Sequence, residues 1–117
     1  MTRYISVVLS NPASGCEDEF NDWYSNWHIP DVLAIPGILA ATRYRRIGEG
    51  AAAPFGRFRY MVVYELETDD LRALFRELNA AVGTARMPMH DALSPELAFY
   101  DWEVLPPRRA KTNDEEP

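Results

Sequence analysis

The sequence predicts a single α+β domain with the element order β-α-β-β-α-β. Its 117 residues suit one domain and leave no room for two. Four segments have the alternation or the β-branched and aromatic content of strands, and two have the periodicity of helices. In this order the strands form an antiparallel four-stranded sheet with the two helices on one face, which is the ferredoxin-like arrangement.

The first strand is predicted from Arg3 to Ser10, where Ile5, Val7 and Leu9 alternate with Tyr4, Ser6 and Val8. A turn follows at residues 11–15, which contain Asn, Pro and Gly. A helix is predicted from about Glu17, with aromatic residues at three- and four-residue steps and acidic residues in its first turn.

Two prolines are expected to shape this helix and its end. Pro30 has no amide hydrogen, so the helix should loosen near Asn26 and Ile29. Pro36 and the glycine after it should end the helix. The second strand is then predicted from Ile38 to Ile47.

The second half of the domain is predicted to hold a strand, a helix and a final strand. Gly48–Gly56 is expected to be a flexible connection, and Phe58–Leu66 the third strand. Thr68 is the expected N-cap of a second helix that carries apolar residues on one side from Leu71 to Val82 and stops at Gly83.

The end of the chain is expected to supply one more strand and a tail. A loop over Thr84–Pro95 leads to a last strand over Leu97–Leu105. Residues 106–117 lack apolar side chains to bury and are expected to fray. The folded domain is therefore predicted to comprise residues 1–105.

The predicted strands are apolar on both faces, although two helices can cover only one. The third strand places Tyr60 and Tyr64 on one side and Met61 and Val63 on the other. An uncovered apolar sheet face marks an interface or a ligand site. We therefore expect two copies to pair their open faces as a homodimer, a dimeric α/β barrel that encloses an apolar pocket.

Composition and charge exclude several classes of partner. Lys and Arg total 12 against 18 Asp and Glu, a net charge of −6, which argues against binding to nucleic acid or to anionic membranes. An RNA-binding sheet with exposed aromatic residues is little supported for the same reason. No apolar run is long enough to span a membrane, and no apolar signal core opens the chain. Cys16 is the only cysteine, so we expect a reducing, cytoplasmic location.

One histidine lies among aromatic residues on the predicted first helix. His28 has Tyr24 four residues before it and Asp31 three residues after it, so the three can share a helix face. An imidazole held by a carboxylate could transfer a proton near neutral pH. The alternative is an ordinary packed histidine, since histidine is commonly half-buried.

The residues Trp23-Tyr24, His28-Ile29-Pro30-Asp31, Ala34-Ile35-Pro36-Gly37 and Ala41-Thr42-Arg43-Tyr44 resemble the EthD-like group of dimeric α/β-barrel proteins. In that group, a first helix with Trp and His-x-Pro leads through a Pro-Gly turn into the second strand. The resemblance is close over the first half of the chain and extends only to element order and length beyond it. It implies a cavity between sheet and helices, with His28 at or near it and Tyr24 and Asp31 as its polar neighbours. The reaction stays open, because members include lyases, cyclases, isomerases, cofactor-free oxygenases and haem enzymes.

Further candidate ligand contacts come from the aromatic residues and from the second histidine. Strand alternation suggests Tyr44, Tyr60 and Tyr64, whose phenols could stabilise developing negative charge, or which could equally be interface aromatics. Trp27 is a candidate substrate contact that could also be core. His90 lies in a loop whose Met and Pro residues suit a cover over an apolar pocket, although an exposed loop histidine is the simpler interpretation.

We expect neither a metal nor a cofactor, and a metal site and a haem site remain as minor alternatives. His28 and Asp31 supply two metal ligands where a site needs a third, and haem needs an axial ligand and a larger pocket. Cys16 has no adjacent base in the sequence, so an inert thiol is expected. A carboxylate could bind the alternating arginines Arg43, Arg45 and Arg46, but solvated side chains are the simpler interpretation.

The function we expect is that of a cofactor-independent lyase or isomerase acting on a small hydrophobic or aromatic carbonyl compound. His28 would be the general acid or base, Asp31 or Tyr24 would orient it, and a strand tyrosine would polarise the substrate oxygen. The alternatives are a non-catalytic small-molecule binding or accessory protein and a cofactor-free monooxygenase.

Overall fold

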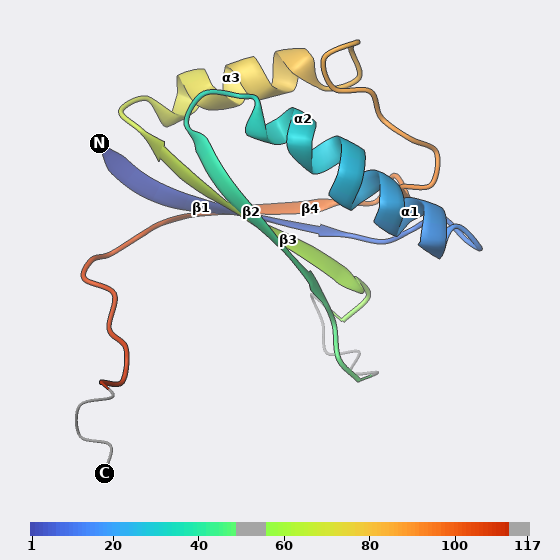
Figure 1. The fold of residues 1–117 in the computed structure, drawn as a ribbon, viewed down its shortest axis with the longest axis horizontal. Helices are drawn as coiled ribbons and strands as arrows, with labels where there is room; N and C mark the ends of the chain where they lie inside the picture. The colour runs from blue at the N-terminus through green and yellow to red at the C-terminus, as the bar shows by residue number, and fades with distance from the viewer. Residues whose placement is uncertain (49–55, 113–117) are drawn as a thin grey trace.

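The computed structural model describes residues 1–48 and 56–112. The elements in chain order are β1 (Thr2–Ser10), α1 (Glu17–Trp23), the π-helical segment η1 (Tyr24–His28), α2 (Ile29–Leu33), β2 (Ile38–Arg45), β3 (Tyr60–Thr68), α3 (Leu71–Ala81) and β4 (Ala98–Glu103). The strands form one sheet in the order β2-β3-β1-β4, with every neighbouring pair antiparallel. All the helices lie over one face of this sheet (Figure 1). The predicted ferredoxin-like α+β fold is confirmed.

The predicted loosening of the first helix before Pro30 is also confirmed, and it takes a defined form. The helix runs on through η1, where the Ile29 amide donates to the Tyr24 carbonyl five residues earlier. Pro30 cannot donate to the preceding turn, so the ladder changes register here rather than breaking. Single π-helical turns of this kind occur frequently at functional sites.

Several element boundaries differ from the predictions. Thr68 is the last residue of β3, paired with Thr2, and is not the N-cap of α3 as predicted. The cap is Asp70, whose carboxylate accepts a hydrogen bond from the Ala73 amide at 3.0 Å. The prediction for Thr68 was wrong because strand pairing holds it, and its hydroxyl instead accepts from the Asp70 amide at 3.1 Å.

The last strand is shorter than predicted and the second strand ends earlier. Strand β4 pairs with β1 only from Ala98 to Glu103, and β2 ends at Arg45. Residues 106–112 are exposed and form neither helix nor strand. Most of the predicted connection Gly48–Gly56 lies outside the described residues.

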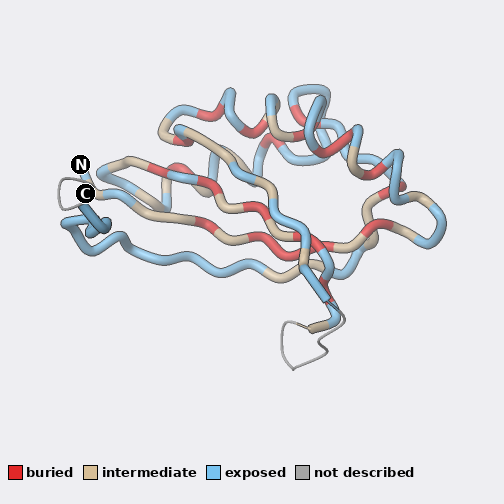
Figure 2. Tube along the Cα trace, turned by 60° about the horizontal axis from the view of Figure 1, so that its bottom comes forward, coloured by how far each residue is buried: buried red, intermediate tan, exposed pale blue. Residues whose placement is uncertain are grey.

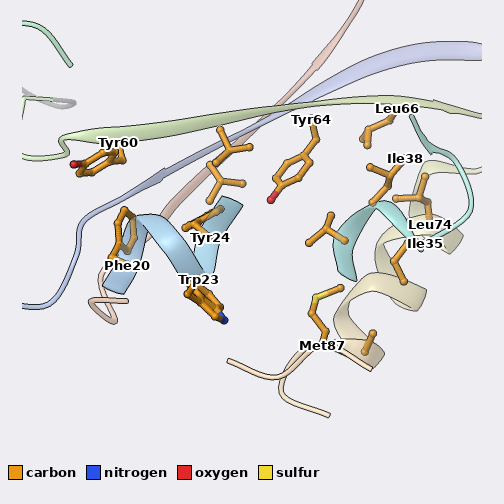
Figure 3. Packing of buried hydrophobic residues seen from close by; sticks show 14 of the residues in the cluster. Phe20, Trp23, Tyr24, Ile35, Ile38, Tyr60, Tyr64, Leu66, Leu74 and Met87 are labelled. Carbon is orange, nitrogen blue, oxygen red and sulfur yellow. The ribbon is translucent and has the colours of Figure 1, made fainter. Parts of the chain in front are cut away.

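The core lies between the helices and the inner face of the sheet. Tyr60, Val62, Tyr64 and Leu66 alternate along β3 and are all buried toward the helices. Figure 3 shows Phe20 of α1 against Tyr60 at one end of this layer, and Leu66 with Ile38 and Leu74 at the other. Between these two packed ends lies the cavity described below.

None of the residues that the structure describes forms a layer over the outer face of the sheet. Tyr44 of β2 and Trp102 of β4 are 47% and 57% exposed, and Met61 and Val63 of β3 lie between them on the same face. Strand β4 is exposed along nearly all its length (Figure 2). The expected apolar outer face is therefore present.

Candidate functional site

A cavity of about 530 Å³ lies between the inner face of the sheet and the helices. Its walls are mainly aliphatic, aromatic and methionine side chains. The residues that line it are Ser6, Val8, Tyr24, His28, Val32, Ile38, Tyr64, Leu66, Phe75, Leu78, Asn79, Val82, Met87, Met89, Leu93, Leu97, Phe99 and Asp101. This size and this balance of apolar walls with a few polar groups are typical of small-molecule sites.

His28 enters this cavity from η1 and is held by aromatic rings. Its imidazole stacks on Trp23 at a centroid distance of 4.7 Å and meets Tyr24 edge to face at 5.1 Å. The side chain is 8% exposed, and Nδ1 is buried without a hydrogen bond. Because Nδ1 is inaccessible, the opposite edge of the ring, which carries Nε2, is the part that can meet a ligand.

Burial determines the charge state of His28. Desolvation lowers the pKa of His28 to about 4, although the nearby negative charge of Asp31 acts in the opposite direction. The imidazole is therefore neutral at neutral pH. Asp31, which is half-buried, influences His28 through its charge, whereas the rings of Trp23 and Tyr24 set the orientation of the imidazole.

The two tyrosines of the cavity belong to a group of buried hydroxyls. Burial raises the pKa of Tyr24. Burial and the neighbouring Tyr24 raise the pKa of Tyr64, so both phenols stay protonated. The hydroxyls of Tyr64 and Ser10 are buried and make no hydrogen bond of ordinary geometry. The ring of Tyr64 lines the cavity, but its hydroxyl does not open into it.

Three polar residues of the lining were missed by the sequence analysis. Ser6 of β1 donates a hydrogen bond to the Asp101 carboxylate of β4 at 2.8 Å, and Asn79 enters from α3. Strand alternation placed Ser6 on the other face of the strand from Ile5 and Val7. A polar residue on that face was the available indication that it lines a site. Asp101 gave no local signal, because it reaches Ser6 only through the pairing of β1 with β4.

The other predicted contacts lie outside the cavity lining. Trp27 is 65% exposed, and Tyr44 lies on the outer face of the sheet. Tyr60 is buried, with its hydroxyl donating to the Glu17 carboxylate and accepting from the Asn21 amide.

His90 is exposed and also lies outside the lining. The centre of its ring lies 6.0 Å from the centre of the Trp23 ring. Its Nδ1 accepts a hydrogen bond from the Ala92 amide at 2.8 Å. The loop that carries it nevertheless contributes Met87, Met89 and Leu93 to the wall, as its composition suggested.

Arg43 supplies a positive charge behind the cavity. Its guanidinium lies 4.9 Å from the centre of the Tyr24 ring and donates to the Asn21 side chain at 2.8 Å and to Ser25 Oγ at 2.9 Å. It therefore joins β2 to α1 and η1. Its charge acts on the hydroxyl group of Tyr24.

Within residues 1–48 and 56–112, no group of three or more His, Cys, Asp or Glu side chains is placed to hold a metal ion. No helix in that part of the chain is long and apolar enough to cross a membrane.

Comparison with known proteins supports the fold. No protein-family model and no curated protein matches the chain. A mutant of MhuD, solved with two manganese protoporphyrin IX per active site, is similar at 16% identity and a TM-score of 0.59, covering 92% of this chain and 99% of that one. A DABB family protein with a ferredoxin-like fold from Mesorhizobium loti is similar at 15% identity and a TM-score of 0.56, covering 91% and 100%.

An EthD family protein from Bacillus halodurans is similar at 18% identity and a lower TM-score of 0.43, covering 86% of this chain and 97% of that one. The first two likenesses are strong enough to identify an architecture, though at this identity they identify nothing finer. The chain therefore has a ferredoxin-like fold.

Proposed function

We propose that this protein binds a small, mainly apolar carbonyl compound in the cavity and moves a proton on it, as a cofactor-independent lyase or isomerase. The observation that carries the proposal is the neutral imidazole of His28 in the wall of an apolar cavity. A buried titratable group with a strongly shifted pKa inside a ligand-sized cavity is the usual mark of a reacting group.

We assign His28 the role of base, because its imidazole is neutral at neutral pH. A neutral imidazole accepts a proton, whereas an imidazolium with a pKa of about 4 is scarce at neutral pH. In the step that we propose, the C–H bond next to the substrate carbonyl breaks, its electron pair forms the enolate, and the proton moves to Nε2 of His28. The same proton then returns to a carbon or leaves with a departing group.

The developing negative charge on the substrate oxygen needs a donor. The Tyr64 hydroxyl does not open into the cavity, so we assign this role to the side-chain amide of Asn79, the one amide among the lining residues that the structure describes. Asp31 then acts at a distance, since its charge favours the imidazolium that forms during the step.

A cofactor-free monooxygenase is the second candidate, and the same apolar lining around His28 favours it. A carbanion formed in an apolar cavity is shielded from water and can instead meet oxygen. Oxygen consumption during turnover distinguishes this reaction from the lyase or isomerase reaction, which consumes none.

The similar MhuD structure holds a porphyrin, so the cavity lining is compared with what a porphyrin requires. Porphyrin carboxylates are anionic, and Asp101 is the only charged residue among the described residues of the lining. A carboxylate in the wall would repel them, and no lining cation compensates. The residues present fit a porphyrin poorly, so we derive no step through one.

The outer sheet face supports a homodimer as the second part of this proposal. Exposed apolar side chains on neighbouring strands, including Tyr44 and Trp102, need a cover. We expect the wild type to have the mass of a dimer by light scattering, and Val63→Glu, in the middle of that face, to be monomeric or much weaker. A wild-type monomer at micromolar concentration would rule out this pairing.

Hydrogen–deuterium exchange on a probe tests the proton transfer directly. 2-Acetylnaphthalene in heavy water, followed by NMR, should exchange its methyl protons faster with protein than without. His28→Gln should reduce the catalysed exchange by roughly two to four orders of magnitude. His90→Gln is the matched control, because it changes a histidine outside the cavity lining. Bound probe that does not exchange would favour a non-catalytic binding protein.

A further inference from the structure

A charged residue of the cavity lining and a charged residue behind that lining lie on the two edge strands of the sheet. Asp101 lies on β4, the edge strand at one side, and Arg43 lies on β2, the edge strand at the other. With neighbouring strands roughly 4.8 Å apart, three steps separate these edges by about 14 Å. Asp101 and Arg43 therefore lie at opposite edges of the sheet.

The two charges meet the cavity differently. Asp101 lines it directly, whereas the Arg43 guanidinium lies behind the Tyr24 ring, 4.9 Å from its centre, and is held there by Asn21 and Ser25. A ligand can thus hydrogen-bond to the carboxylate but experiences the cation only as a field. An elongated polar ligand has one favoured direction in such a field.

Asp101 is exposed on β4, and Ser6 orients its carboxylate. One of its oxygens accepts the hydrogen bond from Ser6 at 2.8 Å, and the register places these two residues directly opposite each other. An ionised carboxylate accepts up to about four hydrogen bonds, so Ser6 orients the group without saturating it. Its remaining capacity is for donors only, because a carboxylate donates none.

We propose that Asp101 is a specificity-determining residue that selects neutral ligands with a hydroxyl or amine donor at one end and a carbonyl at the other. The donor lies at Asp101, and the carbonyl lies where His28 and Asn79 can reach it, as the proposed function requires. Ligands with a carboxylate at the donor end bind more weakly, because two carboxylates would face each other at this end of the cavity. This inference rests on the proposed function and adds the class of substrate to it.

Three naphthalene ketones that differ only at one end make the test: 6-hydroxy-2-acetylnaphthalene, its 6-methoxy ether and its 6-carboxylate. Their binding is followed by fluorescence titration at neutral pH. We expect the hydroxyl compound to bind the wild type roughly tenfold more tightly than the ether, which has lost its donor, and more tightly still than the carboxylate. Asp101→Asn should reduce the discrimination against the carboxylate at least tenfold, since the repelling charge is gone.

Glu103→Gln is the matched control. Glu103 is two residues further along β4 on the same face, exposed, and outside the cavity lining. We expect it to keep the wild-type order of the three ligands. Thermal unfolding of each variant ensures that only folded proteins are compared.

The outcomes separate the two proposals. If the ligands bind and Asp101→Asn ranks them as the wild type does, the specificity role of Asp101 is overturned while the cavity remains a binding site. An equal loss of discrimination in Glu103→Gln also overturns it, because the effect would then come from the general charge of the strand. If none of the three compounds binds the wild type, the proposed function fails and the inference fails with it.

Discussion

Replacing His28 by Gln should remove most of the acid sensitivity that this residue gives to folding. Gln is polar and of similar length, but it does not titrate between pH 3 and 8. In the folded protein, burial lowers the pKa of His28 to about 4, against an ordinary value of 6.5. The unfolded chain therefore binds a proton on His28 between these two pH values while the folded chain does not.

The sign and the size of the effect follow from this difference. The stabilisation is fully present above pH 6.5 and is lost as the pH falls through about 4, since acid favours the unfolded state. At about 1.4 kcal/mol per pKa unit, the contribution is about 3 kcal/mol. Asp31 is the nearby charged group that opposes the shift, so Asp31→Asn should lower the pKa of His28 further and widen the sensitive range.

The assay is urea unfolding followed by tryptophan fluorescence, for wild type and His28→Gln, at pH values from 3.5 to 7.5 and constant protein concentration. The quantity of interest is the difference between their free energies of unfolding, because other acid effects are common to both. We expect the wild type to lose about 3 kcal/mol relative to the variant between pH 7 and pH 3.5. A difference that does not change with pH would refute the burial of a neutral imidazole at this position.

Four further substitutions test the fold that positions the site. Gly37→Ala should destabilise the protein by about 1–3 kcal/mol in chemical unfolding, because Gly37 has φ 95° and an added Cβ would lie 2.7 Å from Leu74 Cδ1; wild-type stability would contradict this close packing. Asp70→Ala should cost about 1 kcal/mol through the lost N-cap of α3, whereas Thr68→Ala should cost less, and the reverse order in thermal unfolding would show that the cap is misassigned. Arg43→Lys should cost about 1–2 kcal/mol, since an ammonium cannot keep both the bonds to α1 and the stacking on Tyr24, and an unchanged unfolding midpoint would show that only the charge matters.

Some features of the site could be predicted from the sequence because they depend on near neighbours along the chain. Pro30 removes one amide from the first helix whatever surrounds it, so the change of register before it was predictable. His28 and Tyr24, four residues apart, were expected on one helix face, and they are in edge-to-face contact. The N-cap of α3 was misplaced because Thr and Asp are both good caps, and the choice depended on how far β3 pairs with β1.

The sequence alone determined the order of the elements, their inner and outer faces and the aromatic setting of His28, because hydrophobic periodicity and proline geometry are local properties. Only the tertiary structure decided which polar groups share the cavity. Ser6 and Asp101 are 95 residues apart and meet through strand pairing, and Asn79 reaches the same cavity from α3. The depth of burial that keeps His28 neutral is likewise set by packing between layers, because desolvation depends on every element that surrounds the ring.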